Sequence, residues 1–190
     1  MLPQGIRPTT QKVKQALFNI LAGRIKNTKV LELFAGSGNL GIEALNRGAE
    51  KVVFVDNDFA CIDAIRQNLK RRDFLEAAEI KRLDFEKALS SFAKKEERFD
   101  LIFADPPYEQ RLGEKILQKV SQCDILFPDG LLIIEHYKKE ILPQEVGNLI
   151  LKKQRKYGDT VLSFYEPCSR NSKHQAPNNK QITSTKIQTI

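Results

Sequence analysis

The strongest constraint on the fold is a regular alternation of strand-like and helix-like segments between residues 29 and 136. Apolar runs suited to strands lie at 29–36, 51–58, 79–84, 99–108 and 130–136, and helical patterns lie between them at 41–48, 59–74, 85–95 and 114–122. Such alternation is typical of a parallel, doubly wound sheet with helices on both faces. We therefore expect an α/β, Rossmann-like fold.

The two ends of the chain depart from this pattern. Residues 9–22 predict a helix capped by Thr9 or Thr10, with apolar side chains recurring on one face. Residues 149–166 hold two strand-like runs separated by Gly158 and Asp159, which predicts a β-hairpin and an antiparallel last strand. We expect three regions: a basic N-terminal helix segment at 1–28 packed on the domain, one domain at 29–166, and a disordered polar tail at 167–190.

Composition narrows the class of protein. The 190 residues, 41% of them hydrophobic, suit a single domain with its own core. No apolar stretch approaches the length of a transmembrane helix, and the first residues lack the apolar segment of a secretory signal. The three cysteines are widely spaced and the histidines number only two, so we expect no metal site and a reducing, cytoplasmic location.

The net charge of +7 is concentrated at the ends of the chain. The first 28 residues hold Lys and Arg but no Asp or Glu, and the region after residue 151 is also basic. Two basic ends suit a surface that binds a polyanion such as RNA, because neutralising phosphates drives sequence-independent affinity. Solvated charge that serves solubility is the alternative interpretation.

A glycine-rich loop follows the first expected strand. In FAGSGNLG, Gly36, Gly38 and Gly41 satisfy G-x-G-x-x-G between a strand and a helix, a pattern that lets a ligand approach the backbone. Alone, the loop fits either the pyrophosphate of a dinucleotide or the methionine end of a methyl donor.

The next two strands end in residues suited to an adenosine. Asp56, Asn57 and Asp58 follow the second strand, where a carboxylate can accept hydrogen bonds from both ribose hydroxyls. Asp84 and Phe85 end the third strand and suit an adenine amino group and ring face. These features fit a dinucleotide and S-adenosylmethionine equally well.

Glu32, inside the first strand, favours a positively charged ligand. A carboxylate there is costly without a partner, and a methyl donor carries both an ammonium and a sulfonium, whereas a pyrophosphate would repel it. The alternative is an edge glutamate that reaches solvent.

The fourth strand ends in Asp105, Pro106, Pro107 and Tyr108, which favours amine methylation. An exocyclic amine on a base is a poor nucleophile, because its lone pair is delocalised into the ring. The Asp105 carboxylate and the Pro106 carbonyl can accept its two N–H groups, and the prolines fix the backbone that aims the carbonyl. Tyr108 offers a flat face for stacking an extruded base. A rigid turn after a buried strand is the alternative.

These motifs together resemble the RsmD-type methyltransferases, bacterial enzymes that methylate the N2 amino group of a guanine in small-subunit (16S) ribosomal RNA. The resemblance runs from about residue 7 to 166. It is carried by Arg7-Pro8-Thr9-Thr10, Lys12, Val13, Leu17-Phe18-Asn19, Leu33-Phe34-Ala35-Gly36-Ser37-Gly38 and Asp105-Pro106-Pro107-Tyr108.

The resemblance implies a seven-stranded, mostly parallel methyltransferase sheet and a site for the donor and the target. S-adenosylmethionine would be bound by Glu32, Gly36, Ser37, Gly38, Asp56, Asn57, Asp84 and Phe85. The guanine amine would be held by Asp105, Pro106, Pro107 and Tyr108. RNA would be contacted near the mouth of the site by Arg7, Thr9, Thr10 and Lys12. The expected partner is small-subunit ribosomal RNA or an assembling subunit, and the expected state is a monomer.

Other functions remain open from the residues alone. The D-P-P-Y motif also suits methylation of an adenine N6 or cytosine N4 amine in RNA or DNA, although no separate DNA-recognition domain fits this length. The glycine loop alone leaves room for an NAD-dependent oxidoreductase. A non-catalytic RNA-binding factor is the alternative from another class of protein.

Overall fold

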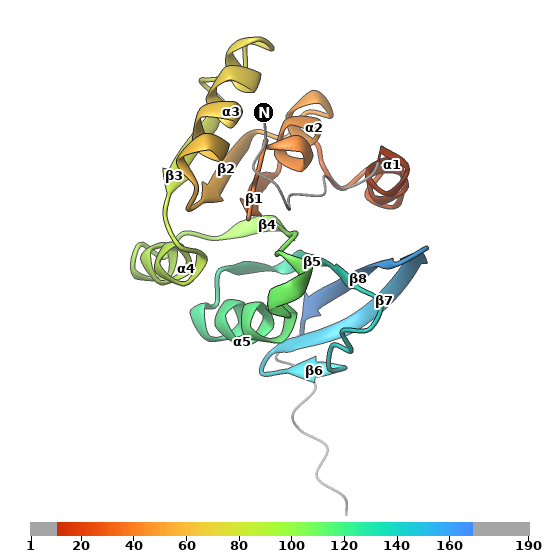
Figure 1. The fold of residues 1–190 in the computed structure, drawn as a ribbon. Helices are drawn as coiled ribbons and strands as arrows, with labels where there is room; N and C mark the ends of the chain where they lie inside the picture. The colour runs from red at the N-terminus through yellow and green to blue at the C-terminus, as the bar shows by residue number, and fades with distance from the viewer. Residues whose placement is uncertain (1–10, 169–190) are drawn as a thin grey trace, which may run out of the picture.

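The alternating segments form one mixed sheet flanked by helices in the computed structural model, which describes residues 11–168 (Figure 1). The helices are α1 (Gln11–Ile20), α2 (Asn39–Asn46), α3 (Phe59–Lys70), α4 (Phe85–Lys94) and α5 (Gly113–Cys123), with a 3₁₀ turn, η1, at Tyr108–Gln110. The strands are β1 (Lys29–Leu33), β2 (Lys51–Asp56), β3 (Ala78–Arg82), β4 (Phe99–Ala104), β5 (Leu126–Tyr137), β6 (Glu145–Val146), β7 (Leu149–Tyr157) and β8 (Thr160–Pro167).

The strand order is β3-β2-β1-β4-β5-β8-β7-β6. Strands β1 to β5 run parallel, and β8, β7 and β6 each pair antiparallel with their neighbours. The expected hairpin is confirmed: β7 turns at Gly158, which has φ of 64°, into β8, and β8 inserts beside β5. The Rossmann-like fold class is therefore confirmed, with helices on both faces.

The sheet within residues 11–168 has eight strands, one more than the resemblance implied. The additional strand, β6, consists of two residues that pair with Leu149 and Ile150 at the edge of the sheet. A two-residue strand is too short to show an alternating pattern, so the sequence contained no signal for it.

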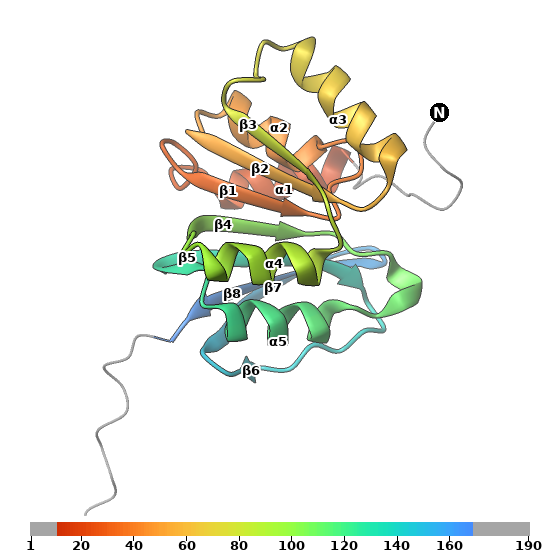
Figure 2. The same ribbon diagram turned by 90° about the vertical axis from the view of Figure 1, so that its left-hand side faces the viewer.

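Two apolar layers hold the helices onto the sheet. Alternate residues of the strands face either α1, α2 and α3 or α4 and α5, because successive side chains of a strand point to opposite faces. In β2, for example, Val52 and Phe54 lie in the first layer, and Val53 and Val55 lie in the second. Figure 2 shows α4 and α5 side by side across one face of the sheet.

Helix α1 packs on the sheet through its apolar face. Val13, Leu17 and Phe18 are buried, and the Phe18 ring lies 5.9 Å from the ring of Phe103 in β4. The residues expected to cap this helix, Thr9 and Thr10, lie outside the described residues, as does most of the expected tail at 167–190.

Several strand ends differ from the expected bounds, and one has a clear cause. Strand β1 ends at Leu33 rather than residue 36, because Phe34 adopts a left-handed conformation with φ of 55° that breaks the extended backbone. Strand β3 ends at Arg82, so Asp84 precedes α4 as its N-cap and Phe85 is the first residue of that helix.

No helix within the described part of the chain has the length and apolarity needed to cross a membrane.

Candidate active site

The candidate site lies at the carboxyl edge of the parallel strands, where strand order reverses between β1 and β4. Parallel pairing places Leu33 opposite Ala104, so the glycine loop and the D-P-P-Y turn leave the sheet from adjacent strands. In open α/β sheets, ligands bind at this kind of switch point. The structure therefore brings together two motifs that are about 70 residues apart in the chain.

The glycine loop is held by hydrogen bonds to neighbouring elements. Gly36 and Gly38 have φ of 54° and 77°, a region that residues with a Cβ rarely adopt. The Gly36 N–H donates to the Asp56 carboxylate at 2.8 Å, and the Ser37 carbonyl accepts from the Asn68 side chain of α3 at 3.0 Å. The loop conformation is thus set by β2 and α3 as well as by its own glycines.

Gly41 permits a close approach between helix α2 and the sheet. A Cβ at this position would lie 2.5 Å from the Phe54 ring and 2.7 Å from both Glu32 Oε2 and Val52. These distances are shorter than real Cβ contacts, so only glycine fits without displacing the helix or these side chains. The third glycine of the motif therefore has a packing role.

Glu32 is bound by the amino end of α2. Its carboxylate is buried and accepts N–H groups from Leu40 at 3.1 Å and from Gly41 at 2.8 Å. These are among the backbone donors that a helix N-terminus leaves without intrahelical partners. Burial raises the pKa of Glu32 to about 8, against the lowering effect of the two backbone N–H groups. Glu32 does not reach solvent, and two backbone N–H groups bind its carboxyl oxygens; contact with the donor stays a prediction.

Four residues expected to bind adenosine line one hollow. Asp56, Asn57, Asp84 and Phe85 surround a small hollow of about 30 Å³ that is also bordered by Phe34, Val55 and Leu83. The Phe34 and Phe85 rings lie 5.1 Å apart, so the wall has an apolar, aromatic part. Phe34 was not expected from the sequence at this place, because nothing in the pattern indicated its left-handed backbone.

The carboxylates of this hollow also order its backbone. The two oxygens of Asp56 accept N–H groups from Gly36 and, at 2.9 Å, from Asp58. Asp84 caps α4 by accepting the Glu86 N–H at 2.9 Å. Each carboxylate oxygen has more than one lone pair, so these bonds leave acceptor capacity for ligand hydroxyls or an amino group.

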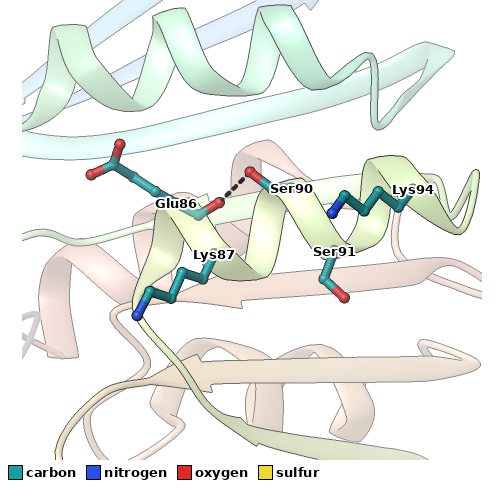
Figure 3. Close-up of a pocket in the computed structure, with 5 residues that line it drawn as sticks. All are labelled: Glu86, Lys87, Ser90, Ser91 and Lys94. Atoms are coloured by element: carbon teal, nitrogen blue, oxygen red, sulfur yellow. Dashed lines mark hydrogen bonds between the residues drawn. The ribbon is translucent and has the colours of Figure 1, made fainter.

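A larger hollow lies along α4 and has different chemistry. It is lined by Glu86, Lys87, Ser90, Ser91 and Lys94, all from one helix, as Figure 3 shows. Its side chains are directed from a single helix surface, and none belongs to the carboxyl edge of the sheet. Convergence of polar groups from several strand ends identifies the smaller hollow as the candidate ligand site.

The D-P-P-Y turn begins directly after β4. Asp105 is half-buried, Pro106 is buried and Pro107 is exposed. Pro107 has φ of −55° and its carbonyl accepts the Gln110 N–H at 3.1 Å, which closes the η1 turn. The two prolines therefore set the path of the backbone between Asp105 and Tyr108.

Tyr108 is held by residues that the sequence analysis did not select. Its hydroxyl donates to Glu135 Oε1 at 2.9 Å and lies 3.0 Å from the Thr160 hydroxyl. Its ring centroid lies 6.0 Å from that of Tyr137, with 30° between the planes. Burial raises the pKa of Tyr108 well above its usual value. Glu135 could have been found as an acid within the apolar run LLIIEH; Thr160 and Tyr137 gave no sequence signal.

The expected RNA-binding residues are only partly described. Lys12 is exposed on α1, whereas Arg7, Thr9 and Thr10 lie outside the described residues. Within residues 11–168, no group of His, Cys, Asp and Glu side chains is arranged to hold a metal ion.

Comparisons with known proteins place this site in a family. The model of the family described as Conserved hypothetical protein 95 matches residues 1–166. Over 160 residues, covering 84% of this chain and 87% of the relative, the chain is 41% identical to YlbH of Bacillus subtilis (strain 168), which is provisionally named an rRNA methyltransferase. It is 34% identical over 168 residues, 86% of this chain and 84% of the relative, to ribosomal RNA small subunit methyltransferase D of Haemophilus influenzae.

A solved structure has the same fold. The Escherichia coli protein yhhF, provisionally titled a methyltransferase, superposes with a TM-score of 0.75 and 27% identity, covering 88% of this chain and 91% of that one.

Proposed function

The chain belongs to the family described as Conserved hypothetical protein 95, which confirms the resemblance to RsmD-type methyltransferases, and from this membership and the site we propose its reaction. We propose that it transfers a methyl group from S-adenosylmethionine to the exocyclic N2 amine of a guanine in small-subunit ribosomal RNA. The observation that carries the proposal is the pairing of Leu33 with Ala104, because it sets the glycine loop beside the D-P-P-Y turn.

The residues of the glycine loop and its neighbours fit S-adenosylmethionine. We assign the adenosine to the hollow bordered by Asp56, Asn57, Asp84 and Phe85. Asp56 and Asp84 retain acceptor capacity for ribose hydroxyls and the adenine amine, and Phe85 supplies an apolar wall. The methionine end would then lie along Gly36, Ser37 and Gly38, near Glu32, whose ionised form its ammonium and sulfonium charges would favour.

The target amine is assigned to the D-P-P-Y turn. When bound, the donor would supply an electrophilic methyl group on a positively charged sulfur. In a single displacement the N–C bond forms as the S–C bond breaks, S-adenosylhomocysteine leaves, and the amine gives up one proton to solvent. Asp105 and the Pro106 carbonyl accept the two N–H groups of the amine and favour the pyramidal nitrogen that attacks. An ordinary aspartate is a weak base at neutral pH, so Asp105 acts mainly as an acceptor that orients the amine. Tyr108 stacks on the base.

The proposed reaction needs no covalent intermediate on the protein. It transfers neither an acyl nor a phosphoryl group. The nucleophile is the amine of the substrate, which explains why the site needs acceptors and a stacking surface rather than an activated Ser or Cys. The three cysteines, Cys61, Cys123 and Cys168, have no role in the proposed reaction.

We assign RNA contacts to Arg7, Thr9, Thr10 and Lys12, with residues 1–28 as a basic segment and 29–166 as the catalytic domain. The exposed position of Lys12 on α1 supports the assignment of RNA contacts. The partner would be small-subunit rRNA or an assembling small subunit. The protein would bind it as a monomer in the cytoplasm. Light scattering of the purified chain tests the monomer.

Methyl transfer from labelled S-adenosylmethionine tests the proposed function. Small subunits and rRNA from cells lacking the modification would be compared with duplex DNA, and the labelled product would be digested to nucleosides. We expect label in N2-methylguanosine from ribosomal substrates only, and transfer roughly 10²–10³-fold slower with the Asp105→Ala variant. Label in N6-methyladenosine or N4-methylcytidine would replace the proposed target. Donor binding without label in any substrate would favour a non-catalytic RNA-binding factor.

A further inference from the structure

We propose that Glu135, Thr160 and Tyr137 are positioning residues that hold the ring of Tyr108 in one orientation for stacking on the target base. The proposal rests on the proposed function, since it assigns roles around the same base-binding turn. It adds three residues from β5 and β8 to the four residues of the D-P-P-Y motif.

The hydrogen bonds of the Tyr108 hydroxyl have one consistent assignment. Glu135 is an acceptor as a carboxylate, so the single phenolic proton is donated to its Oε1 at 2.9 Å. The Thr160 hydroxyl, 3.0 Å away, then donates to the Tyr108 oxygen. The hydroxyl is thereby used in both directions, once as donor and once as acceptor.

The strand register places all three supporting residues on one face of the sheet. Tyr137 of β5 is paired directly with Thr160 of β8, and paired residues of neighbouring strands share a face. Glu135 precedes Tyr137 by two residues and lies on the same face. Tyr108 enters from the end of β4, the neighbouring strand, and meets this group from the side.

Glu135 is costly for the protein unless it is hydrogen-bonded. It is only 4% exposed, and a buried carboxylate without a partner would be strongly disfavoured. Charge-assisted hydrogen bonds to a carboxylate are stronger than neutral ones. The bond to Tyr108 therefore restrains a side chain of the proposed base-binding turn as well as satisfying the buried acid.

The arrangement fixes Tyr108 at both ends. Its backbone follows two prolines, which restrict the turn, and its hydroxyl is anchored to β5 and β8. The Tyr137 ring packs against it with a small angle between the planes. A ring held in this way loses little freedom when a base stacks on it, which favours the productive geometry.

A double-mutant cycle tests the proposal. Tyr108→Phe keeps the ring but removes the anchored oxygen, and Thr160→Val removes one donor with little change in shape. For transfer to the RNA, we expect kcat to fall about 10-fold in Tyr108→Phe and about 3-fold in Thr160→Val, with unchanged donor affinity, because small misplacements of reacting groups cost up to about 10²-fold. Their combination should be no slower than Tyr108→Phe, since Thr160 acts through the missing hydroxyl.

Tyr157→Phe is the matched control. Tyr157 is a half-buried tyrosine of β7 opposite Thr160, and its substitution should leave kcat unchanged. Glu135→Gln keeps an acceptor, and its kcat should lie between those of the wild type and Tyr108→Phe. Additive losses in the double variant, wild-type turnover in Tyr108→Phe, or an equal loss in Tyr157→Phe would overturn the proposal.

A measurement without RNA separates this inference from the proposed function. In a sample with ¹³C-labelled tyrosine, the Tyr108 signal is identified by its absence in Tyr108→Phe. We expect that signal to shift and narrow in Thr160→Val and Glu135→Gln, as the ring begins to flip faster, and to persist unchanged in Tyr157→Phe. An unchanged Tyr108 signal in both variants would contradict the positioning role, whether or not the chain methylates guanine.

Discussion

The two halves of the site are built in different ways. In the donor half, formed at the ends of β1, β2 and β3, acidic side chains bind backbone N–H groups, as Glu32 does at α2 and Asp56 does at Gly36. In the target half, formed at the ends of β4 and β5 and the start of β8, side chains bind one another, as Tyr108 does with Glu135 and Thr160. The bonds of the donor half order loops, and the bonds of the target half orient the ring of Tyr108.

This difference matches what each half is proposed to recognise. A small ligand that is bound along a loop needs the backbone in a defined conformation, which carboxylates at strand ends can impose through N–H groups. An extruded base needs a rigid aromatic surface and an aimed acceptor, which depend on side-chain geometry. Substitutions in the donor half should therefore weaken donor affinity. Substitutions in the target half should lower turnover.

The largest expected effect is in the target half, at Asp105. Asp105→Ala removes the side-chain acceptor for the amine, and we expect kcat to fall by roughly 10²–10³, as for other preorganised hydrogen-bonding groups. Calorimetric affinity for S-adenosylmethionine should be retained. Asp129→Ala, an exposed residue near the amino end of β5, is the control and should keep wild-type turnover. A large loss of donor affinity in Asp105→Ala would remove the division between the halves.

The next effect is in the donor half, at Gly41. Gly41→Ala introduces a Cβ at 2.5 Å from Phe54 and 2.7 Å from the Glu32 carboxylate, so α2 or these side chains must shift. We expect a loss of about 1–3 kcal/mol in the free energy of unfolding, measured in urea, together with weaker donor binding. Gly158→Ala also strains a left-handed residue but has open space around it, and it should leave donor affinity unchanged. Equal donor affinity in both variants would show that the close packing of α2 is not needed for the loop.

A smaller effect distinguishes two helix caps. Asp84→Ala and Asp58→Ala each remove an N-cap, of α4 and α3 respectively, and each should cost about 1 kcal/mol of stability. Only Asp84 borders the hollow, so only its variant should also bind S-adenosylmethionine more weakly in calorimetry. Equal donor affinities for the two variants would place the adenosine elsewhere.

The smallest effect is optical and concerns Tyr165, which lies in the opposite apolar layer, outside both halves of the site. All four tyrosines lie between residues 108 and 165, in the chain from the D-P-P-Y turn to β8. Burial raises the pKa of Tyr165 to about 12, and its hydroxyl donates to the Pro143 carbonyl at 2.7 Å. Because the folded state disfavours the phenolate, this contribution to stability is complete below the unfolded pKa near 10 and is lost as pH rises toward 12.

Tyr165→Phe should therefore remove a late component from the rise of tyrosinate absorbance in alkali, and should reduce the loss of stability between pH 10 and 12. Donor affinity at neutral pH should stay at the wild-type value. The part of the late rise that Tyr108 contributes should remain. If the late rise keeps its full wild-type amplitude in this variant, the assignment to Tyr165 is wrong.

Local patterns were sufficient to predict most of the fold. The strand-like runs at 51–58 and 99–108 became β2 and β4 within a few residues, because buried parallel strands have continuous apolar sequences that contrast with the helices between them. The turn at Gly158 followed from turn chemistry. Strand β6 and the left-handed Phe34 did not follow, since each is imposed by tertiary contacts rather than by its own residues.

The candidate site was predictable only where residues adjoin a motif. Asp56, Asp84 and Asp105 could be selected because each follows a strand, and strand ends meet at one edge. The partners of Glu32 and Tyr108 could not be selected in this way. Glu32 binds a helix eight and nine residues further on, and Tyr108 binds residues 27 and 52 positions away, whose proximity depends on strand register.

The bonds around the glycine loop have a thermodynamic consequence. Ala35 N–H donates to Val55, Gly36 to Asp56 and Gly38 to Ala35, and Asn68 holds Ser37, so the protein's own groups hold the loop. A loop held by such internal bonds adds little coupled folding to the binding equilibrium. The heat-capacity change of donor binding should therefore be small, set by the apolar surface of the donor itself, and its affinity should change only gradually with temperature.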